Sequence, residues 1–222
     1  MARPVVIFGT GDLAQLACVY LRADSPHQVA AFTVHAAYLK ETRLLGLDVV
    51  PFETLTQTHP PEAYDMFVAV GYKRVNKARE EIYHECKARG YKLITYVNSK
   101  AAVWGEVTLG DNCFIFEENV IQPFVTIGNN VICWSGNHIG HHARIGDHCF
   151  IASHAVISGH VEIGEHCFVG VNATFRDGVK IGRGCVIGAG AAIMKDTSDE
   201  EVYAVKTTEV SRVKSHQLRG FK

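Results

Sequence analysis

A repeat of six residues places the strongest constraint on how this chain can fold. From Leu109 onward, every sixth residue is apolar over fifteen consecutive positions. These positions are Leu109, Ile115, Ile121, Ile127, Cys133, Ile139, Ile145, Ile151, Ile157, Ile163, Val169, Phe175, Ile181, Ile187 and Ile193. An inward residue every six, with a corner after each short strand, predicts three-sided coils of eighteen residues, stacked about 4.8 Å apart. The pattern therefore predicts a β-solenoid of five coils.

The eighteen-residue coil also predicts which side chains stack. Two residues before the apolar position stand small or medium residues, and Cys113, Cys149, Cys167 and Cys185 share that place, with Val131 completing the column. We expect these cysteines to be buried and reduced, as small hydrophobic side chains in a narrow core. Asn119 and Asn137 are one coil apart, which predicts an inward amide pair like the ladders of stacked β-structures.

Before Asn98 the pattern is different, because short apolar runs alternate with helical patterns. The predicted strands are Val5 to Phe8, Val29 to Val34, Met66 to Val70 and Lys92 to Val97. The helical stripes are Leu13, Leu16, Ala17, Tyr20 and Leu21, and then Val75, Ala78, Ile82, Tyr83 and Cys86 within 74–89. This alternation predicts a small parallel α/β domain. We expect domains at 1–98 and 99–195, followed by a tail at 196–222.

Composition excludes several classes of function. The 222 residues carry 22 Lys+Arg against 23 Asp+Glu, so no basic footprint predicts a nucleic-acid partner. No apolar run approaches the ~18 residues of a membrane span, and the first apolar segment is too short for a signal-peptide core. Seven cysteines without a Cys-x-x-Cys pair predict a reduced chain with a cytoplasmic location.

Seven of the twelve histidines lie between His138 and His166. His142, His148, His154, His160 and His166 share one place in the hexad, so His142 should stack on His160 and His148 on His166. We expect most of them on exposed turns or in subunit contacts. Zinc is the alternative, but no cysteine partner and no helical His-x-x-x-His supports it, so no metal is expected.

His141 stands apart from the other histidines, because it follows Gly140 where the repeat usually has a small or acidic residue. An imidazole with its ordinary pKa of about 6.5, held on a rigid scaffold, is suited to accept a proton at neutral pH. A surface histidine without a function is the alternative that the residues alone favour.

Over residues 4–195 the chain resembles bacterial nucleotide-sugar N-acyltransferases of the left-handed β-helix superfamily. The bacillosamine- and perosamine-pathway acetyltransferases and the sialic-acid O-acetyltransferase-like proteins belong to this group. The resemblance implies an α/β N-terminal Rossmann-like domain that holds the nucleotide sugar. It also implies a C-terminal left-handed parallel β-helix of hexapeptide repeats that binds acyl-CoA, working as a homotrimer.

The resemblance also implies roles for individual residues. The family's catalytic histidine matches His141, and the carboxylate that often follows it is replaced here by His142. The base would then be weaker, or oriented by another acid, and His138 is the second candidate for it. The implied acyl-CoA contacts are Phe150, Gly159, Val171 and Ala189. Gly159 and Ala189 offer backbone amides that suit a carbonyl oxygen.

The nucleotide contacts implied by the resemblance lie in the N-terminal domain. They are Gly11, Asp12, Leu13, Thr33, Val34 and Gly71. Gly9-Thr10-Gly11-Asp12-Leu13-Ala14 follows the first strand and opens a helix, so its amides can meet a phosphate. Tyr72, Lys73 and Arg74 either meet the diphosphate or cap a helix. Relatives often have acids where this chain has Thr33-Val34-His35, which disfavours a tightly bound NAD.

The function predicted on this basis is transfer of an acyl group, most simply acetyl from acetyl-CoA, to the amino group of a nucleotide-linked amino-deoxysugar. Transfer would be direct, with His141 as general base and no nucleophilic cysteine or serine. Two alternatives stay open: O-acetylation of a sugar of the sialic-acid type, and a non-catalytic solenoid that binds nucleotide sugars. The segment from Tyr203 to Lys222 is expected only to pack on the solenoid or on its neighbour.

Overall fold

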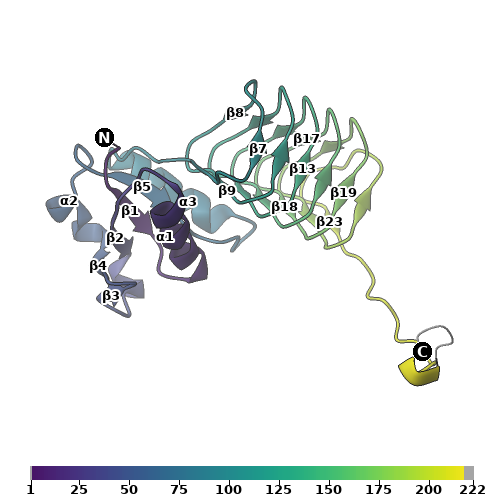
Figure 1. Ribbon diagram of the computed structural model, residues 1–222, viewed down its shortest axis with the longest axis horizontal. Coiled ribbons are helices and arrows are strands. Elements are labelled where there is room, and N and C mark those ends of the chain that lie inside the picture. The colour runs from purple at the N-terminus through teal and green to yellow at the C-terminus, as the bar shows by residue number, and fades with distance from the viewer. Residues whose placement is uncertain (1, 218–222) are drawn as a thin grey trace.

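The computed structural model describes residues 2–217, which form an N-terminal α/β part and a long stack of coils (Figure 1). The N-terminal sheet has the strand order β3-β4-β2-β1-β5. Strands β1, β2, β4 and β5 are parallel, and β3 is an antiparallel edge. The strands are β1 (Val5–Phe8), β2 (Val29–Val34), β3 (Arg43–Leu44), β4 (Leu47–Pro51) and β5 (Asp65–Val68).

The helices cover the N-terminal sheet. Because its central strands are buried on both faces, their sequences are mostly apolar instead of alternating apolar and polar residues. Every residue of β1 and β5 is buried. The helices are α1 (Asp12–Asp24), α2 (Leu55–Thr58) and α3 (Lys77–Ala88), with short 3₁₀ turns η1 (Ala36–Tyr38), η2 (Phe52–Thr54) and η3 (Ser215–Gln217). The predicted strands at 5–8 and 29–34 and the first predicted helix are confirmed.

Two predicted elements differ in the structure. The second helix begins at Lys77 instead of Arg74, because Arg74, Val75 and Asn76 all have positive φ and form a tight loop. Lys92 to Val97 does not close the N-terminal sheet as one strand. Only a single bridge joins Leu93 to Met66, and the end of the segment pairs with a coil of the solenoid.

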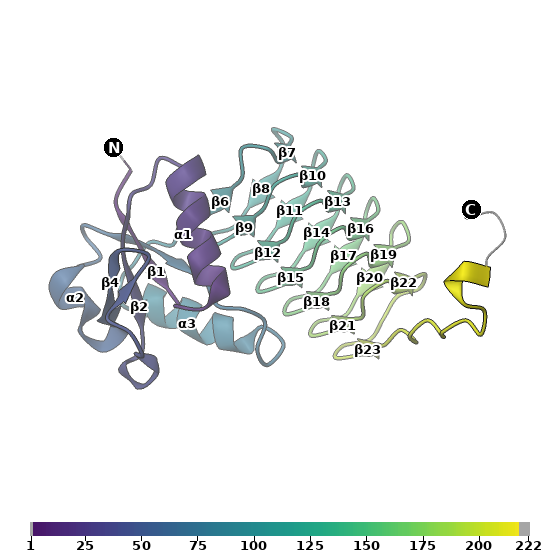
Figure 2. The same ribbon diagram turned by 60° about the horizontal axis from the view of Figure 1, so that its bottom comes forward.

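The solenoid consists of two-residue parallel strands on three faces, joined by tight turns (Figure 2). The seven-stranded face holds β6 (Tyr96–Val97), β9 (Phe114–Ile115), β12 (Ile132–Cys133), β15 (Phe150–Ile151), β18 (Phe168–Val169), β21 (Val186–Ile187) and β23 (Val202–Tyr203). The six-stranded face holds β7 (Ala102–Val103), β10 (Val120–Ile121), β13 (His138–Ile139), β16 (Val156–Ile157), β19 (Thr174–Phe175) and β22 (Ala192–Ile193). The five-stranded face holds β8 (Thr108–Leu109), β11 (Thr126–Ile127), β14 (Arg144–Ile145), β17 (Glu162–Ile163) and β20 (Lys180–Ile181).

The predicted columns are confirmed. Strand partners are eighteen residues apart, as in Ile121 beside Ile139, except β21 and β23, which are sixteen apart. The second residue of these strands points into a continuous apolar core. Cys113, Cys149, Cys167 and Cys185 are all fully buried in that core. The side-chain amide of Asn137 donates to Oδ1 of Asn119 at 3.0 Å, as the ladder predicts.

The N-terminal part packs on the outer side of the seven-stranded face. The outward residues Phe114, Ile132 and Phe150 share one buried cluster with β1 and α1. After Tyr203 the chain is largely exposed and runs away from the solenoid to η3, so the expected packing of this tail is not seen within one chain (Figure 1). Within residues 2–217 no helix is both long and apolar enough to cross a membrane; residues 218–222 of the predicted tail lie outside the described part.

The buried cysteine column predicts thiol reactivity. Burial raises the pKa of Cys113 to about 12 and also raises that of Cys149, so neither forms the reactive thiolate at neutral pH. Because all four thiols are fully buried, we expect Ellman's reagent to leave Cys113, Cys149, Cys167 and Cys185 unmodified in the native protein and to titrate all seven cysteines in guanidinium. Mass spectrometry of the labelled peptides identifies the sites. Rapid native labelling of the four would contradict the register.

Candidate active site

The predicted base lies at the corner where the six-stranded face turns into the five-stranded face. His141 and His142 form the turn between β13 and β14, and Gly159 and His160 form the turn one coil further on. The second residue of each turn, His142 or His160, has the left-handed φ of about +60° that closes the corner. The solenoid therefore stacks these histidines at one edge of the molecule.

The imidazoles at this corner contact one another. His142 stacks on His160 with ring centroids 4.9 Å apart and an interplanar angle of 16°, so the predicted stacking is confirmed. The His141 ring lies edge-on to both, and its Nδ1 is 3.2 Å from Nδ1 of His142. The backbone N–H of His141 donates to Oε1 of Gln122 at 2.9 Å. In the tautomer in which Nδ1 of His141 donates to Nδ1 of His142, Nε2 of His141 carries the lone pair and can accept a proton from a substrate.

His138, the second candidate base, lies one strand earlier than this corner. It is half-buried on the outer side of β13, and its strand neighbours are Val120 and Val156. This places it on the six-stranded face instead of in the turn.

The four predicted acyl-CoA contacts do not meet in one place within a single chain. Gly159 shares the corner of His141, whereas Val171 and Ala189 stack at the corner between the seven-stranded and six-stranded faces. Phe150 is buried under the N-terminal part, where it stacks on Phe168 and meets the edge of Tyr72. Phe150 is thus engaged in packing between the two parts of the chain.

The predicted nucleotide contacts come together at one edge of the N-terminal sheet. Because β1, β2 and β5 are parallel neighbours, Gly11, Thr33, Val34 and Gly71 all follow or end strands at their carboxyl ends. Asp12 and Leu13 open α1, whose N-terminus has no side-chain cap. The free amides of this first turn are suited to an anion.

Tyr72, Lys73 and Arg74 follow β5, and their side chains have different surroundings. Tyr72 packs against Phe150 and Phe168, so it bridges the two parts of the chain. Arg74 pairs with Glu81 on α3. Lys73 is exposed.

Glu53 is a charged residue at this edge that the sequence pattern did not indicate. Its carboxylate accepts the N–H of Ala36 at 2.9 Å and lies 3.2 Å from Nδ1 of His35. Backbone N–H donors, its own and that of Ala36, lower its pKa. An acid therefore does lie beside the end of β2, but it comes from η2, about twenty residues further along the chain.

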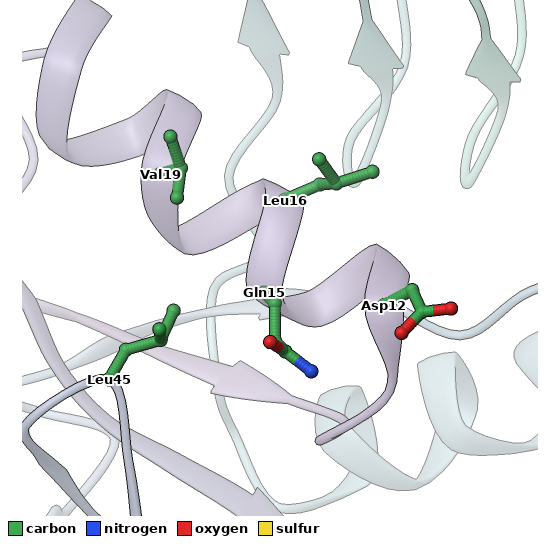
Figure 3. Close-up of a pocket in the computed structure, with 5 residues that line it drawn as sticks. All are labelled: Asp12, Gln15, Leu16, Val19 and Leu45. Atoms are coloured by element: carbon green, nitrogen blue, oxygen red, sulfur yellow. The ribbon is translucent and has the colours of Figure 1, made fainter.

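Two surface hollows adjoin α1. One, of about 310 Å³, lies between the outward side of α1 and Leu45, and is lined by Asp12, Gln15, Leu16 and Val19 (Figure 3). The other, of about 530 Å³, lies at the junction with the first coil and includes Tyr20, Asp24, Lys100 and Glu117. Neither hollow includes His141.

A second group of histidines lies beneath α3, contrary to the expectation that these side chains are exposed. His148 is buried and His166 half-buried, and their rings stack with centroids 5.0 Å apart. The Oε1 atom of Glu80 lies 3.6–3.8 Å from Nε2 of His84, His148 and His166. The docking of α3 on this corner of the solenoid is what covers them.

An amide ladder fixes the tautomer of His148. Asn112 accepts the N–H of Val68 and donates to Oδ1 of Asn130, so the Asn130 amide nitrogen donates to Nδ1 of His148 at 2.9 Å. Neutral His148 therefore carries its proton on Nε2, directed at Glu80. Glu80, His84 and His148 are near enough to hold a metal ion, but in this tautomer Nε2 of His148 carries a proton, and the carboxylate of Glu80 lies 3.7 Å from it as an electrostatic contact between α3 and the solenoid.

Comparison with known proteins defines the class of the solenoid. Residues 124–159 match the family described as bacterial transferase hexapeptide (six repeats), and residues 160–195 match the hexapeptide repeat of succinyl-transferase. These repeats, with parallel strands stacked in order, fit a left-handed β-helix. A search of curated protein sequences finds no match.

Solved structures match the chain over nearly its whole length. PerB from Caulobacter crescentus, in complex with CoA and GDP-perosamine, is 28% identical with a TM-score of 0.81, covering 90% of this chain and 92% of that one. A point variant of perosamine N-acetyltransferase from the same organism, with the same ligands, is 26% identical with a TM-score of 0.66 and the same coverage. The acetyltransferase domain of PglB from Neisseria gonorrhoeae, with acetyl coenzyme A, shares the fold at 24% identity and a TM-score of 0.79, covering 90% and 95%.

The repeats and these whole-chain matches together define an acyltransferase of the hexapeptide-repeat class. Over 90% of its length the chain is similar to a solved nucleotide-sugar acetyltransferase, and its repeats match two hexapeptide-repeat transferase models.

The His148 cluster predicts how stability depends on pH. Burial, together with the neighbouring His166, lowers the pKa of His148 to about 4. An unfolded histidine takes up a proton near pH 6.5, so folding loses up to about 3 kcal/mol as the pH falls from 6.5 to 4. Above pH 6.5 this contribution does not change. Besides His166, the groups that face His148 are Glu80, His84, Asp147 and Arg79.

His148→Asn is the matched variant, because an asparagine continues the amide ladder and does not titrate. Urea unfolding measured from pH 7.5 to 4.5 should show a smaller loss of stability in the variant than in the wild type. Equal slopes would contradict the assignment of this pH dependence to His148.

Proposed function

We propose that this chain transfers an acyl group, most simply acetyl, from acyl-CoA to the amino group of a nucleotide-linked amino-deoxysugar. The observation that carries the proposal is the match over 90% of the chain to a protein solved with both CoA and GDP-perosamine. In this proposal the N-terminal part acts as a Rossmann-like domain for the nucleotide, and the solenoid holds the acyl-CoA.

The proposed base is His141. An amine that arrives as an ammonium must lose a proton before its lone pair can attack, and Nε2 of a neutral imidazole takes that proton. The nitrogen then attacks the thioester carbonyl, the C–S bond breaks, and the products are an amide, the CoA thiol and one proton released to water. Attachment to a hydrogen-bonded turn of the solenoid supports this role, because the turn holds the imidazole in a fixed place.

The N–H of Gly159 is the proposed donor to the thioester oxygen. Gly159 lies one coil above His141 at the same corner, and within residues 2–217 its N–H has no hydrogen-bond partner. A backbone amide already fixed in place stabilises a developing oxyanion without reorganisation. Ala189 offers an amide of the same kind, but at the other corner.

We propose that the nucleotide lies at the carboxyl edge of the N-terminal sheet. The uncapped first turn of α1, at Asp12 and Leu13, would face the diphosphate. Gly11, Thr33, Val34 and Gly71 surround the same edge, and Lys73 is the exposed cation beside it. The hydroxyl of Thr33 already donates to the carbonyl of Val50 at 2.8 Å, so its role there would be through packing and its backbone.

A homotrimer would bring the separated acyl-CoA contacts together. Gly159 lies at one border of the six-stranded face, and Val171 and Ala189 lie at the other border. The outer side of this face carries exposed Val120 and Val156, which an adjacent solenoid would cover. The corner of one chain would then meet the opposite corner of its neighbour across this face.

His141→Asn should reduce kcat by roughly 10²–10⁴, the usual effect of removing a general base. The dissociation constant for CoA, measured by calorimetry, should change little, because the ring serves the proton transfer. Activity is measured as CoA release, with the product identified as an amide or an ester by mass spectrometry. His27→Asn, on the N-terminal part, is the control and should retain wild-type turnover.

Two outcomes separate the candidate bases. Full activity in His141→Asn together with loss of activity in His138→Asn would assign the base to His138. Full activity in both variants would contradict a histidine base at this corner.

The proposed trimer predicts a mass of three chains of 24.4 kDa each in light scattering at micromolar concentration. Val120→Lys with Val156→Lys places charge on the six-stranded face and should release monomers that lose transferase activity. A wild-type monomer with full activity would exclude an acyl-CoA site that needs two solenoids.

A further inference from the structure

Three residues stand one above another at the His141 corner. His141, Gly159 and Asp177 are each the first residue of a turn, and successive members are one coil apart. His141 and Asp177 are therefore separated by a residue that has no side chain. Both are exposed, whereas Gly159 is buried between them.

The imidazole and the carboxylate both lean into the space that Gly159 leaves free. A Cβ placed on Gly159 would lie 2.9 Å from Nε2 of His141 and 2.9 Å from Oδ1 of Asp177. The two atoms are thus separated by at most twice that distance. No ion pair within 4.0 Å joins them in the described part of the chain, so a gap remains between the two groups, above Gly159.

Other acids in turns of this solenoid are used differently. Asp147 stands at the same place of another corner, and its Oδ1 accepts the N–H of Asn129, one coil below, at 2.6 Å. Asp199 accepts the N–H of Arg183 in the same manner at 2.9 Å. Among residues 2–217 nothing donates to the carboxylate of Asp177, so it is not used to close its turn and stays free to bind a ligand.

We propose that Asp177 is a substrate-binding residue that holds the sugar ammonium against His141. This inference rests on the proposed function and deepens it, because it names the group that selects an amine as acceptor. An ammonium has three N–H donors, so it can bond to Nε2 of His141 and to Oδ1 of Asp177 together. His141 removes one proton, while Asp177 keeps the nitrogen over Gly159 and stays ionised.

The carboxylate also determines which acceptor is favoured. A sugar hydroxyl has one proton and no charge, so it bonds to one of the two groups and leaves the negative charge of Asp177 unbalanced. An ammonium satisfies both. The pair therefore favours N-acylation over O-acylation, and Asp177 supplies the fixed negative charge that this chain lacks at His142.

The test compares Asp177→Asn with the wild type, using a panel of nucleotide-linked amino sugars that includes GDP-perosamine, with acetyl-CoA as donor. Loss of one charged hydrogen bond should raise KM for the amino sugar roughly 10- to 100-fold, while KM for acetyl-CoA stays within about 2-fold. Asp177→Glu should restore part of the affinity. Asp147→Asn, in the equivalent turn position, is the matched control and should leave both KM values unchanged.

A second measurement does not depend on turnover. Calorimetry in the presence of CoA compares an amino sugar nucleotide with the same compound carrying a hydroxyl in place of the amine. The wild type should prefer the amine, and Asp177→Asn should lose that preference. Gly159→Ala, whose Cβ closes the gap at a backbone φ that alanine tolerates, should lower kcat/KM at least as much as Asp177→Asn.

The outcomes separate this inference from the proposed function. If the wild type transfers acetyl to an amine and Asp177→Asn keeps both its KM and its preference for the amine, Asp177 has no role in binding and the transferase function stands. If the wild type acylates no amino sugar of the panel, the proposed function itself fails and the inference fails with it.

Discussion

Parallel pairing between coils of equal length is the constraint on which the rest of this structure depends. From β6 to β22 each two-residue strand pairs with strands eighteen residues away, so a side chain stands directly above or below the residue one coil distant. This register places four cysteines in one core column and amides over amides. It also brings His141, Gly159 and Asp177 to one corner from three separate coils. In such a fold a substitution affects the residues stacked above and below it, and a functional site is built from residues of several successive coils.

Besides the apolar packing of residues such as Phe114 and Phe150 against β1 and α1, one buried cation links the two parts of the chain. Arg79 of α3 is fully buried, and its guanidinium donates to the backbone carbonyls of Asn130, His148 and Cys149 in successive turns of the solenoid. Burial lowers its pKa to about 10, so it stays charged at neutral pH. Asn76 makes the matching contacts to the next coil through its amide. These bonds fix α3 on the corner and so set where the nucleotide edge lies relative to the solenoid.

Sequence reasoning succeeds here where a single periodicity controls the result. The hexad positions predict the core, the cysteine column and the stacking of His142 on His160, because each depends only on spacing. It fails where a contact between the two parts of the chain determines whether a residue is buried. The burial of His148 follows from the docking of α3, which the hexad pattern does not record. The late start of α3 follows from three consecutive positive φ angles at residues 74–76.

The acidic residues of the candidate site also could not be found from spacing alone. Glu53 reaches the end of β2 from a distant 3₁₀ turn, so a search along the second strand misses it. Asp177 lies two coils from His141, and spacing alone gives it the same place as several other turn residues. Only the geometry over Gly159 and the unused carboxylate distinguish it. The signal that can find it from sequence is a Gly between His and Asp in one eighteen-residue column.

The central claim is that one corner of the solenoid joins the sugar amine, His141 and the thioester. A crystal structure of His141→Asn soaked with CoA and a nucleotide-linked amino sugar tests it most directly, because a slow variant retains both ligands. We expect the amine nitrogen over Gly159, within hydrogen-bond distance of Asp177 and of residue 141, with the CoA sulfur at the same corner. An amino sugar ordered with its nitrogen away from this corner, or CoA bound on another face, would contradict the account.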